Sequence, residues 1–317
     1  MKKTLWTMVL AVAVYTAIVF LTDIRAVGAA IASLKLWMVP LFLSLSLLNY
    51  FLRFLKWQYF LRRVEVLVPW PESLRVFLAG FSMTVSPGKL GELLKCYLLK
   101  ERRGVPVSRT SPVVVAERLT DLLSMILIAA VGLLLVRHRG ALLAVAAGVV
   151  FVAAVMVLLL WDRAFSMLVG LLCRIDHFAR RRESIQGFQR HCCLLLDHRS
   201  LLVSVPLGML SWGAEALVLC VVSMALGIDP ALPVGLALLA HSAGTIAGAV
   251  SMIPGGLGLT EVTIGAILTV WMSRADAAAV TLIMRFATLW FAVLLGLLVL
   301  AGIRSGRKAA KMDIEDG

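Results

Sequence analysis

Two arginines lie inside apolar stretches of the sequence, where a charged side chain is unusual. Arg118 falls in the run 112–136 and Arg285 in the run 277–303. A charged residue within a membrane span costs at least about 2.5 to 3.5 kcal/mol on insertion scales, so it normally faces a cavity or a partner. The planar guanidinium is well matched to phosphate oxygens. Both arginines are therefore predicted to bind an anionic substrate group.

A Pro/Gly motif that breaks an apolar stretch precedes each arginine. A broken helix persists in a bilayer only inside protein or beside a wet cavity. The half-helix after each motif carries about half a unit of positive charge at its N-terminal amides, which attracts anions, and glycines let a headgroup approach the backbone. The alternative is that the glycines only permit tight helix crossing. The residues predicted to bind substrate are Pro87, Gly88, Lys89 and Gly91 in the first motif and Pro254, Gly255, Gly256 and Gly258 in the second.

Two glutamates, Glu92 and Glu261, follow the motifs and are included in the predicted site. A carboxylate in the first turn of a half-helix complements the helix dipole and caps free amides, so capping is the default interpretation. A proton-carrying or amine-binding role is the alternative.

Ion pairing offers a structural interpretation of the arginines as well. Arg118 has Asp121 one turn on and Glu117 beside it, so a local ion pair is plausible there. Arg285 has no acid near it in sequence, and its partner would be Glu215 or Glu261.

The composition places these residues in an integral membrane protein. Hydrophobic residues make up 61% of the 317-residue chain, charged residues 15%, and the mean hydropathy is +0.96. A span needs about 20 apolar residues. The first long run is longer than the roughly 7 to 15 residues of a secretory signal core, so it is interpreted as an anchored helix. The runs that reach spanning length lie at residues 5–21, 36–52, 112–136, 141–161, 201–226 and 277–303.

The sequence contains no metal-binding or nucleotide-binding motif. The five cysteines and five histidines are scattered without the spacing of metal ligands, and no phosphate-binding loop or nucleotide fingerprint is present. His241, in an apolar stretch, is interpreted as a packing residue. No cofactor, metal or catalytic residue is predicted.

The chain matches itself at an offset of 167 residues. The shift places the first Pro/Gly motif on the second and Arg118 on Arg285 without a gap. Each repeat unit then reads helix, broken hairpin, helix. The prediction is one all-α polytopic membrane domain, 1–317, with about six transmembrane helices and two re-entrant helical hairpins. Its parts are repeat 1 at about 34–136, a linking helix and basic segment at 141–200, repeat 2 at about 201–303 and a charged tail at 304–317.

The distribution of basic residues predicts the orientation. With both termini inside, most of the 31 Lys and Arg residues face the cytoplasm. Three spans then separate the hairpins, so they enter from opposite faces and the repeats are inverted, a construction used by transporters. The basic loop 162–200 is expected to lie on the cytoplasmic membrane surface, with a solvated linker as the alternative. Contact with the membrane surface then accounts for the net charge of +13, and no nucleic-acid partner is predicted.

The motifs carry a family resemblance. SPGKLGE followed by AERLTDLL, and IPGGLGLTE followed by Arg285-Phe286, resemble the transmembrane region of the lysylphosphatidylglycerol synthetase/flippase family over roughly residues 5–303. The resemblance implies movement of charged phospholipids between leaflets or a part in polyprenyl-linked sugar pathways. The chain ends soon after the last span, so the soluble aminoacyl-transferase domain of bifunctional members is not carried over.

The expected function is translocation of an anionic or phosphate-bearing lipid in the cell's inner membrane, without enzymatic activity. The expected partners are membrane lipids, and a second copy or a lipid-synthesis enzyme is a further candidate. A membrane-embedded glycosyl or lipid-phosphate transferase, an accessory protein of envelope biosynthesis and a non-transporting scaffold are the alternatives.

Overall fold

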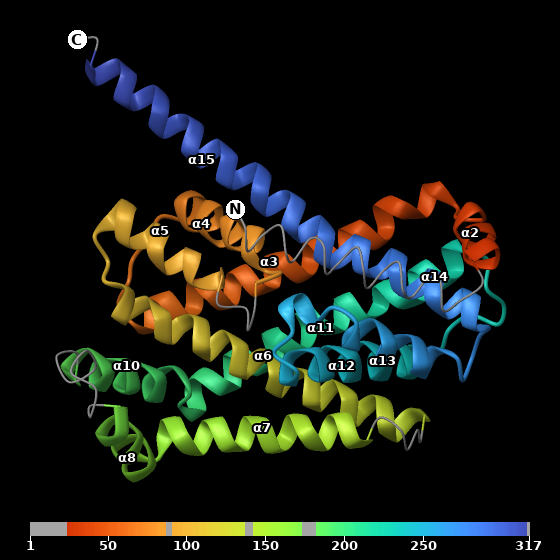
Figure 1. Ribbon diagram of the computed structural model, residues 1–317, viewed down its shortest axis with the longest axis horizontal. Helices are drawn as coiled ribbons and strands as arrows, with labels where there is room; N and C mark the ends of the chain where they lie inside the picture. The colour runs from red at the N-terminus through yellow and green to blue at the C-terminus, as the bar shows by residue number, and fades with distance from the viewer. Residues whose placement is uncertain (1–23, 87–90, 137–141, 173–181, 316–317) are drawn as a thin grey trace.

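The protein is an all-helical polytopic membrane protein (Figure 1). Its computed structural model describes residues 24–86, 91–136, 142–172 and 182–315, and these residues contain helices and loops but no strand. The expected first span, 5–21, lies outside the described residues.

Four long helices in the described residues are apolar enough to cross a membrane, and each has 28 or 30 residues. The bent pair α7 (Leu142–Leu160) and α8 (Asp162–Leu172) adds a fifth span if it is counted as one, although its two helices meet at 80°. The expected count of six stays a prediction. The four helices are η1-α3 (Leu36–Met38 and Val39–Arg63), α6 (Val107–Val136), α11 (His198–Ala225) and α14 with its continuation (Arg274–Arg285, η6 at Phe286–Trp290, and α15 at Phe291–Glu315).

Helices are interrupted at both Pro/Gly motifs. In the first half, α4 (Trp70–Gly80) runs into η2 (Phe81–Met83), and α5 (Leu94–Arg103) follows the motif. In the second half, α12 (Val234–Val250) is followed by η5 (Pro254–Gly256) and α13 (Leu259–Leu268). Gly255, Gly256 and Gly258 have positive φ angles, which L-residues with a side chain rarely adopt. This backbone explains why the helix stops at the second motif.

The starts of two long helices agree with the predicted offset. Helix α6 begins at Val107 and α14 at Arg274, which are 167 residues apart. Both helices begin earlier than the apolar runs indicated, because polar residues extend their first turns.

The two halves pack across each other. Helix α12 of the second half lies along α6 of the first half, and α11 lies along α3. Figure 1 shows α6 running beside α12, with α7 along the outer side of α6. One apolar core joins α11, α12, α13 and α14, and a second joins α3, α4, α5 and α6.

The remaining helices are peripheral. Helix α2 (Ile24–Ala32) packs against α14, and α10 (Arg182–Leu195) packs along α6. Asp197 caps α11 by accepting a hydrogen bond from the Ser200 N–H at 2.7 Å. The basic loop therefore contains helices, as expected, but α10 lies against the helical bundle.

Candidate functional site

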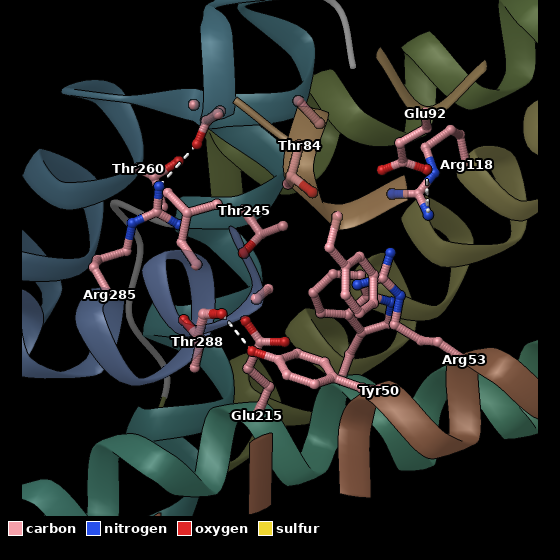
Figure 2. Close-up of a pocket in the computed structure, with 18 residues that line it drawn as sticks. Tyr50, Arg53, Thr84, Glu92, Arg118, Glu215, Thr245, Thr260, Arg285 and Thr288 are labelled. Atoms are coloured by element: carbon pink, nitrogen blue, oxygen red, sulfur yellow. Dashed lines mark hydrogen bonds and ion pairs between the residues drawn. The ribbon is translucent and has the colours of Figure 1, made fainter. Parts of the chain in front are cut away.

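A small polar cavity lies where the two halves meet (Figure 2). Its volume is about 60 Å³. Figure 2 shows Arg285 on one side of the cavity and Arg118 and Arg53 on the other. Both predicted arginines are eleven residues into their helices, since α6 begins at Val107 and α14 at Arg274. The residues that line the cavity are Tyr50, Arg53, Phe81, Thr84, Glu92, Arg118, Trp212, Glu215, Thr245, Gly248, Ala249, Gly255, Gly256, Thr260, Arg285, Thr288, Leu289 and Ala292.

Arg118 belongs to a network of buried charges in the first half. Its guanidinium lies 3.0 Å from Asp121 and 3.3 Å from Glu92. Asp121 also pairs with Lys56 of α3. The local ion pair considered for Arg118 is therefore present with Asp121, and Glu92 joins it from the broken segment.

A second pair completes this network. Lys95 lies 2.6 Å from Glu117 and 3.9 Å from Glu92, and its ammonium sits 4.4 Å from the centre of the Trp57 ring. Glu117 thus binds the broken segment to α6.

Arg285 joins the broken segment of the second half to α14. Its Nε donates to Glu261 Oε1 at 2.6 Å, and its Nη2 donates to the Gly255 carbonyl at 2.8 Å. The other Glu261 oxygen accepts a hydrogen bond from the Gly258 N–H at 2.7 Å. Glu261 is therefore both the helix cap and the arginine's partner. Glu215, the other candidate partner, lines the cavity from α11.

Glu92 is placed differently from Glu261. Residues Gly91–Leu93 form a single 3₁₀ turn before α5, so Glu92 precedes the α-helix instead of lying in its first turn. Gly91 donates its N–H to Ser86 Oγ at 2.7 Å, which ties the end of the loop back to its start. The capping interpretation holds for Glu261, whereas Glu92 pairs with Arg118.

The glycines of the second motif allow close backbone approach. A Cβ on Gly256 would lie 2.4 Å from Thr260 Oγ1 and 3.1 Å from the Cα of Gly248 in α12. Gly255 and Gly256 both line the cavity. The glycines are therefore consistent with both interpretations, tight helix crossing and close approach of a headgroup. The same turn packs against α12 and exposes its backbone to the cavity.

Arg53 is the most informative residue that sequence reasoning missed. The apolar run was expected to end at Leu52, but α3 continues to Arg63 and buries Arg53, which is 8% exposed. Its guanidinium lies 5.3 Å from the Phe81 ring centre and 5.0 Å from that of Trp212. It forms no ion pair with the residues that the structure describes. Helical spacing could have revealed Arg53, since Asn49, Arg53 and Lys56 lie on one face of the helix.

Several hydrogen-bond donors in the cavity wall lack partners. A buried donor left unsatisfied costs about 1 to 3 kcal/mol. A ligand with several acceptor oxygens would remove this cost. Arg118 Nη2 makes no hydrogen bond by geometry but lies within ion-pair distance of Asp121. The buried cavity atoms with no hydrogen-bond partner among the described protein atoms are Arg53 Nε, Thr84 Oγ1, Arg118 Nε and Nη2, and Trp212 Nε1.

A larger apolar groove adjoins the polar cavity. Its volume is about 390 Å³, and its walls come from α6, α7, α10, α11 and α12. Residues that line both spaces are Arg118, Trp212, Thr245, Gly248 and Ala249. Met252 and Ile253, 56% and 37% exposed, lie at its edge. The polar cavity and the apolar groove are thus continuous.

The predicted site residues divide into three groups. Pro87, Gly88 and Lys89 lie outside the described residues. Glu92, Arg118, Gly255, Gly256 and Arg285 line the cavity, and Glu261 reaches it through Arg285. Gly91, Pro254 and Gly258 do not line it but shape the turns beside it.

Two other predictions concern histidine and metal ligands. His241 is buried, and its ring centre lies 6.2 Å from that of Trp212, which fits a packing residue. Neither ring nitrogen has a hydrogen-bond partner among the described atoms. Within the part of the chain that the structure describes, no three His, Cys, Asp or Glu side chains gather in a way that could hold a metal ion.

The fold and cavity define a polytopic helical membrane protein with a charged site enclosed by two halves of one chain. The family model for the lysylphosphatidylglycerol synthase transmembrane region matches residues 8–296. The chain belongs to this family, and the resemblance found in its motifs is confirmed. The family links the chain to membrane lipids.

A more distant relative is the glycosyltransferase AglD of Haloferax volcanii, which is 26% identical over 244 residues. The match covers 65% of this chain and 39% of AglD, so the shared region spans well under half of that protein.

Proposed function

We propose that this protein moves an anionic, phosphate-bearing lipid from one leaflet of the membrane to the other. The observation that supports this most is the buried cavity, where arginines from both halves surround donors that have no hydrogen-bond partner among the described residues. Such donors favour a ligand rich in acceptor oxygens, and guanidinium groups suit phosphate. The family's link to membrane lipids agrees with a lipid as the carrier of that phosphate.

The proposed architecture has six spans and two re-entrant hairpins that enter from opposite membrane faces. Inverted repeats with discontinuous helices allow a site near the midplane to open to either side. The equal position of Arg118 and Arg285 along their helices supports this symmetry. Both termini are proposed to lie in the cytoplasm and the protein in the cell's inner membrane, because the basic residues then face inward.

The proposed role is transport without a chemical change to the lipid. During transport the headgroup passes through the polar cavity while the hydrocarbon stays in the apolar groove or the surrounding bilayer.

A second candidate function is transfer of a sugar or phosphate to a lipid, or support of an enzyme that does so, because the chain is similar to AglD. Release of a new glycolipid by the purified chain and an activated sugar would favour that candidate.

The direct test is translocation by purified protein in liposomes, measured with a panel of fluorescent anionic lipids. We expect at least one lipid to cross about ten times faster than in protein-free liposomes. Arg118→Gln is expected to lower the rate about 10- to 100-fold, as loss of roughly 1.5 to 3 kcal/mol of a charged hydrogen bond implies. Arg62→Gln, at an exposed position of α3, is the control. Rates no faster than in empty liposomes for every lipid would refute the proposal.

A further inference from the structure

We infer that the cavity binds the phosphate monoester of a single-chain lipid, held by Arg53 and Trp212, with its chain in the adjoining apolar groove. This inference rests on the proposed function and narrows its substrate. It excludes a diacyl lipid with a large headgroup.

The size of the polar cavity limits the headgroup. A volume of about 60 Å³ is well below the roughly 300 to 1,000 Å³ of small-ligand pockets. A phosphate group fits such a space. A sugar, an aminoacyl group or a glycerol headgroup beyond the phosphate does not.

The donors of the cavity suit a terminal phosphate. Arg53 and Trp212 are 92% and 94% buried, and each presents a nitrogen without a hydrogen-bond partner among the described protein atoms. Thr84 adds a hydroxyl and Arg118 a further nitrogen. A monoester has three oxygens free to accept these bonds, and a diester has two. The donor set therefore favours a phosphate at the end of the molecule.

The pairing of charges in the wall points to Arg53. Three arginines line the cavity, together with the carboxylates of Glu92 and Glu215. Glu92 faces Arg118 at 3.3 Å, and Arg285 is held by Glu261. Among the described residues Arg53 makes no ion pair, and its guanidinium lies over the Phe81 and Trp212 rings. Arg53, beside Trp212, is therefore the cavity arginine best placed to bind a phosphate.

The groove fixes where the hydrocarbon must be. Because Arg118, Trp212 and three α12 residues line both spaces, the phosphate site adjoins the apolar site directly. A groove of about 390 Å³ is near the lower end of the roughly 300 to 1,000 Å³ of small-ligand pockets. It has room for one chain, which enters from the bilayer past Met252 and Ile253.

The first part of the test compares ligands on the wild-type protein. The full chain is placed in phosphatidylcholine nanodiscs, and binding is measured by native mass spectrometry with dodecyl phosphate, dodecanol, inorganic phosphate and phosphatidylglycerol. We expect one dodecyl phosphate to bind at least ten times more tightly than any of the other three. Equal or tighter binding of phosphatidylglycerol overturns the inference without any variant.

The second part locates the site with matched variants. Arg53→Gln should weaken dodecyl phosphate binding at least tenfold, and Trp212→Phe, which keeps a ring but removes the N–H, should weaken it several-fold. Arg62→Gln on the same helix should leave it unchanged. Val155→Trp in the groove wall should weaken binding of dodecyl phosphate more than that of inorganic phosphate, whereas Val157→Trp, 52% exposed on the same helix, should not. Wild-type affinity in both Arg53→Gln and Val155→Trp places the ligand elsewhere and overturns the inference.

Translocation separates this inference from the proposed function. If dodecyl phosphate binds as described but no lipid crosses the membrane, the ligand class stands and the transport proposal fails. If phosphatidylglycerol crosses and dodecyl phosphate does not bind, transport stands and the single-chain inference fails.

Discussion

At the scale of single residues, the buried charges are matched across elements. Lys56 of α3 pairs with Asp121 of α6, Lys95 of α5 with Glu117 of α6, and Arg285 with Glu261 of α13. Removing one member of a buried pair leaves an uncompensated charge, which costs about 3 to 5 kcal/mol. The first pair therefore joins two long helices, and the other two hold the broken segments against long helices.

Arg285→Ala is expected to destabilise the protein by about 3 to 5 kcal/mol, because Glu261 would remain buried without its cation. The measurement is denaturant unfolding of purified protein in detergent. Arg274→Ala, at the exposed first position of the same helix, should change stability by less than about 0.5 kcal/mol. Unchanged stability in Arg285→Ala would show that the pair does not hold the hairpin.

Sequence reasoning found the residues whose charge stood out against apolar neighbours, such as Arg118 and Arg285. It missed Arg53 and Lys56, because a run of apolar residues ends before them while the helix does not. Thr84 and Trp212 give no charge signal at all. Trp212 reaches the cavity through the packing of α11 against α3, and Thr84 lies directly after η2; no local sequence pattern specifies either placement.

At the scale of elements, α14 passes through a π-helical turn, Phe286–Trp290, directly after Arg285. Turns of this kind are rare and often lie at functional sites. The Tyr50 hydroxyl donates to the Thr288 carbonyl in this turn at 2.5 Å. The turn and α3 are thereby joined beside the cavity.

Tyr50→Phe removes that hydrogen bond and is expected to cost about 0.5 to 1.5 kcal/mol of stability. Thermal unfolding followed by tryptophan fluorescence measures the loss. Tyr59→Phe on the same helix, whose hydroxyl makes no hydrogen bond in the described structure, is the control. Equal unfolding temperatures for the two variants would contradict the role of this bond.

The second Pro/Gly turn depends on its glycine backbone. Gly256→Ala is expected to cost about 1 to 3 kcal/mol, because φ is +67° and the new methyl would meet Thr260 and Gly248. Gly265→Ala, in the open middle of α13, should be neutral or slightly stabilising. The same thermal measurement tests both; a neutral Gly256→Ala would show that the turn tolerates side chains.

The positions of the helix breaks could be predicted, because proline and glycine interrupt helices wherever they cluster. The start of the first half-helix could not. The sequence predicted a half-helix directly after the motif, but α5 begins at Leu94 after a 3₁₀ turn. The hydrogen bond from Gly91 to Ser86 closes that loop, and such a local contact depends on the fold around it.

At the scale of the whole molecule, the cavity exists because the halves cross each other. Helix α12 packs on α6 and α11 on α3, so both halves of the chain contribute residues to the cavity wall. The offset of 167 residues predicted two similar units. It did not predict how they interlock, because that depends on side-chain packing between segments distant in sequence.

The proposed topology places Arg103 in the cytoplasm and Asp229 outside. Single cysteines at these two exposed positions, in a background without the five native cysteines, are expected to react oppositely with a membrane-impermeant thiol reagent. In intact cells only the cysteine at 229 should be labelled. Labelling at 103 from outside would end the inverted-repeat proposal.

Transport as proposed requires that one buried cavity serve both faces of the membrane. Accessibility of a cysteine in the cavity wall tests this most directly, with Thr84→Cys and, independently, Thr245→Cys in the same cysteine-free background. In proteoliposomes of known orientation, the impermeant reagent is added from one side at a time. The account predicts labelling from both sides, slowed by bound dodecyl phosphate. Labelling from one side only, in both variants, would contradict it.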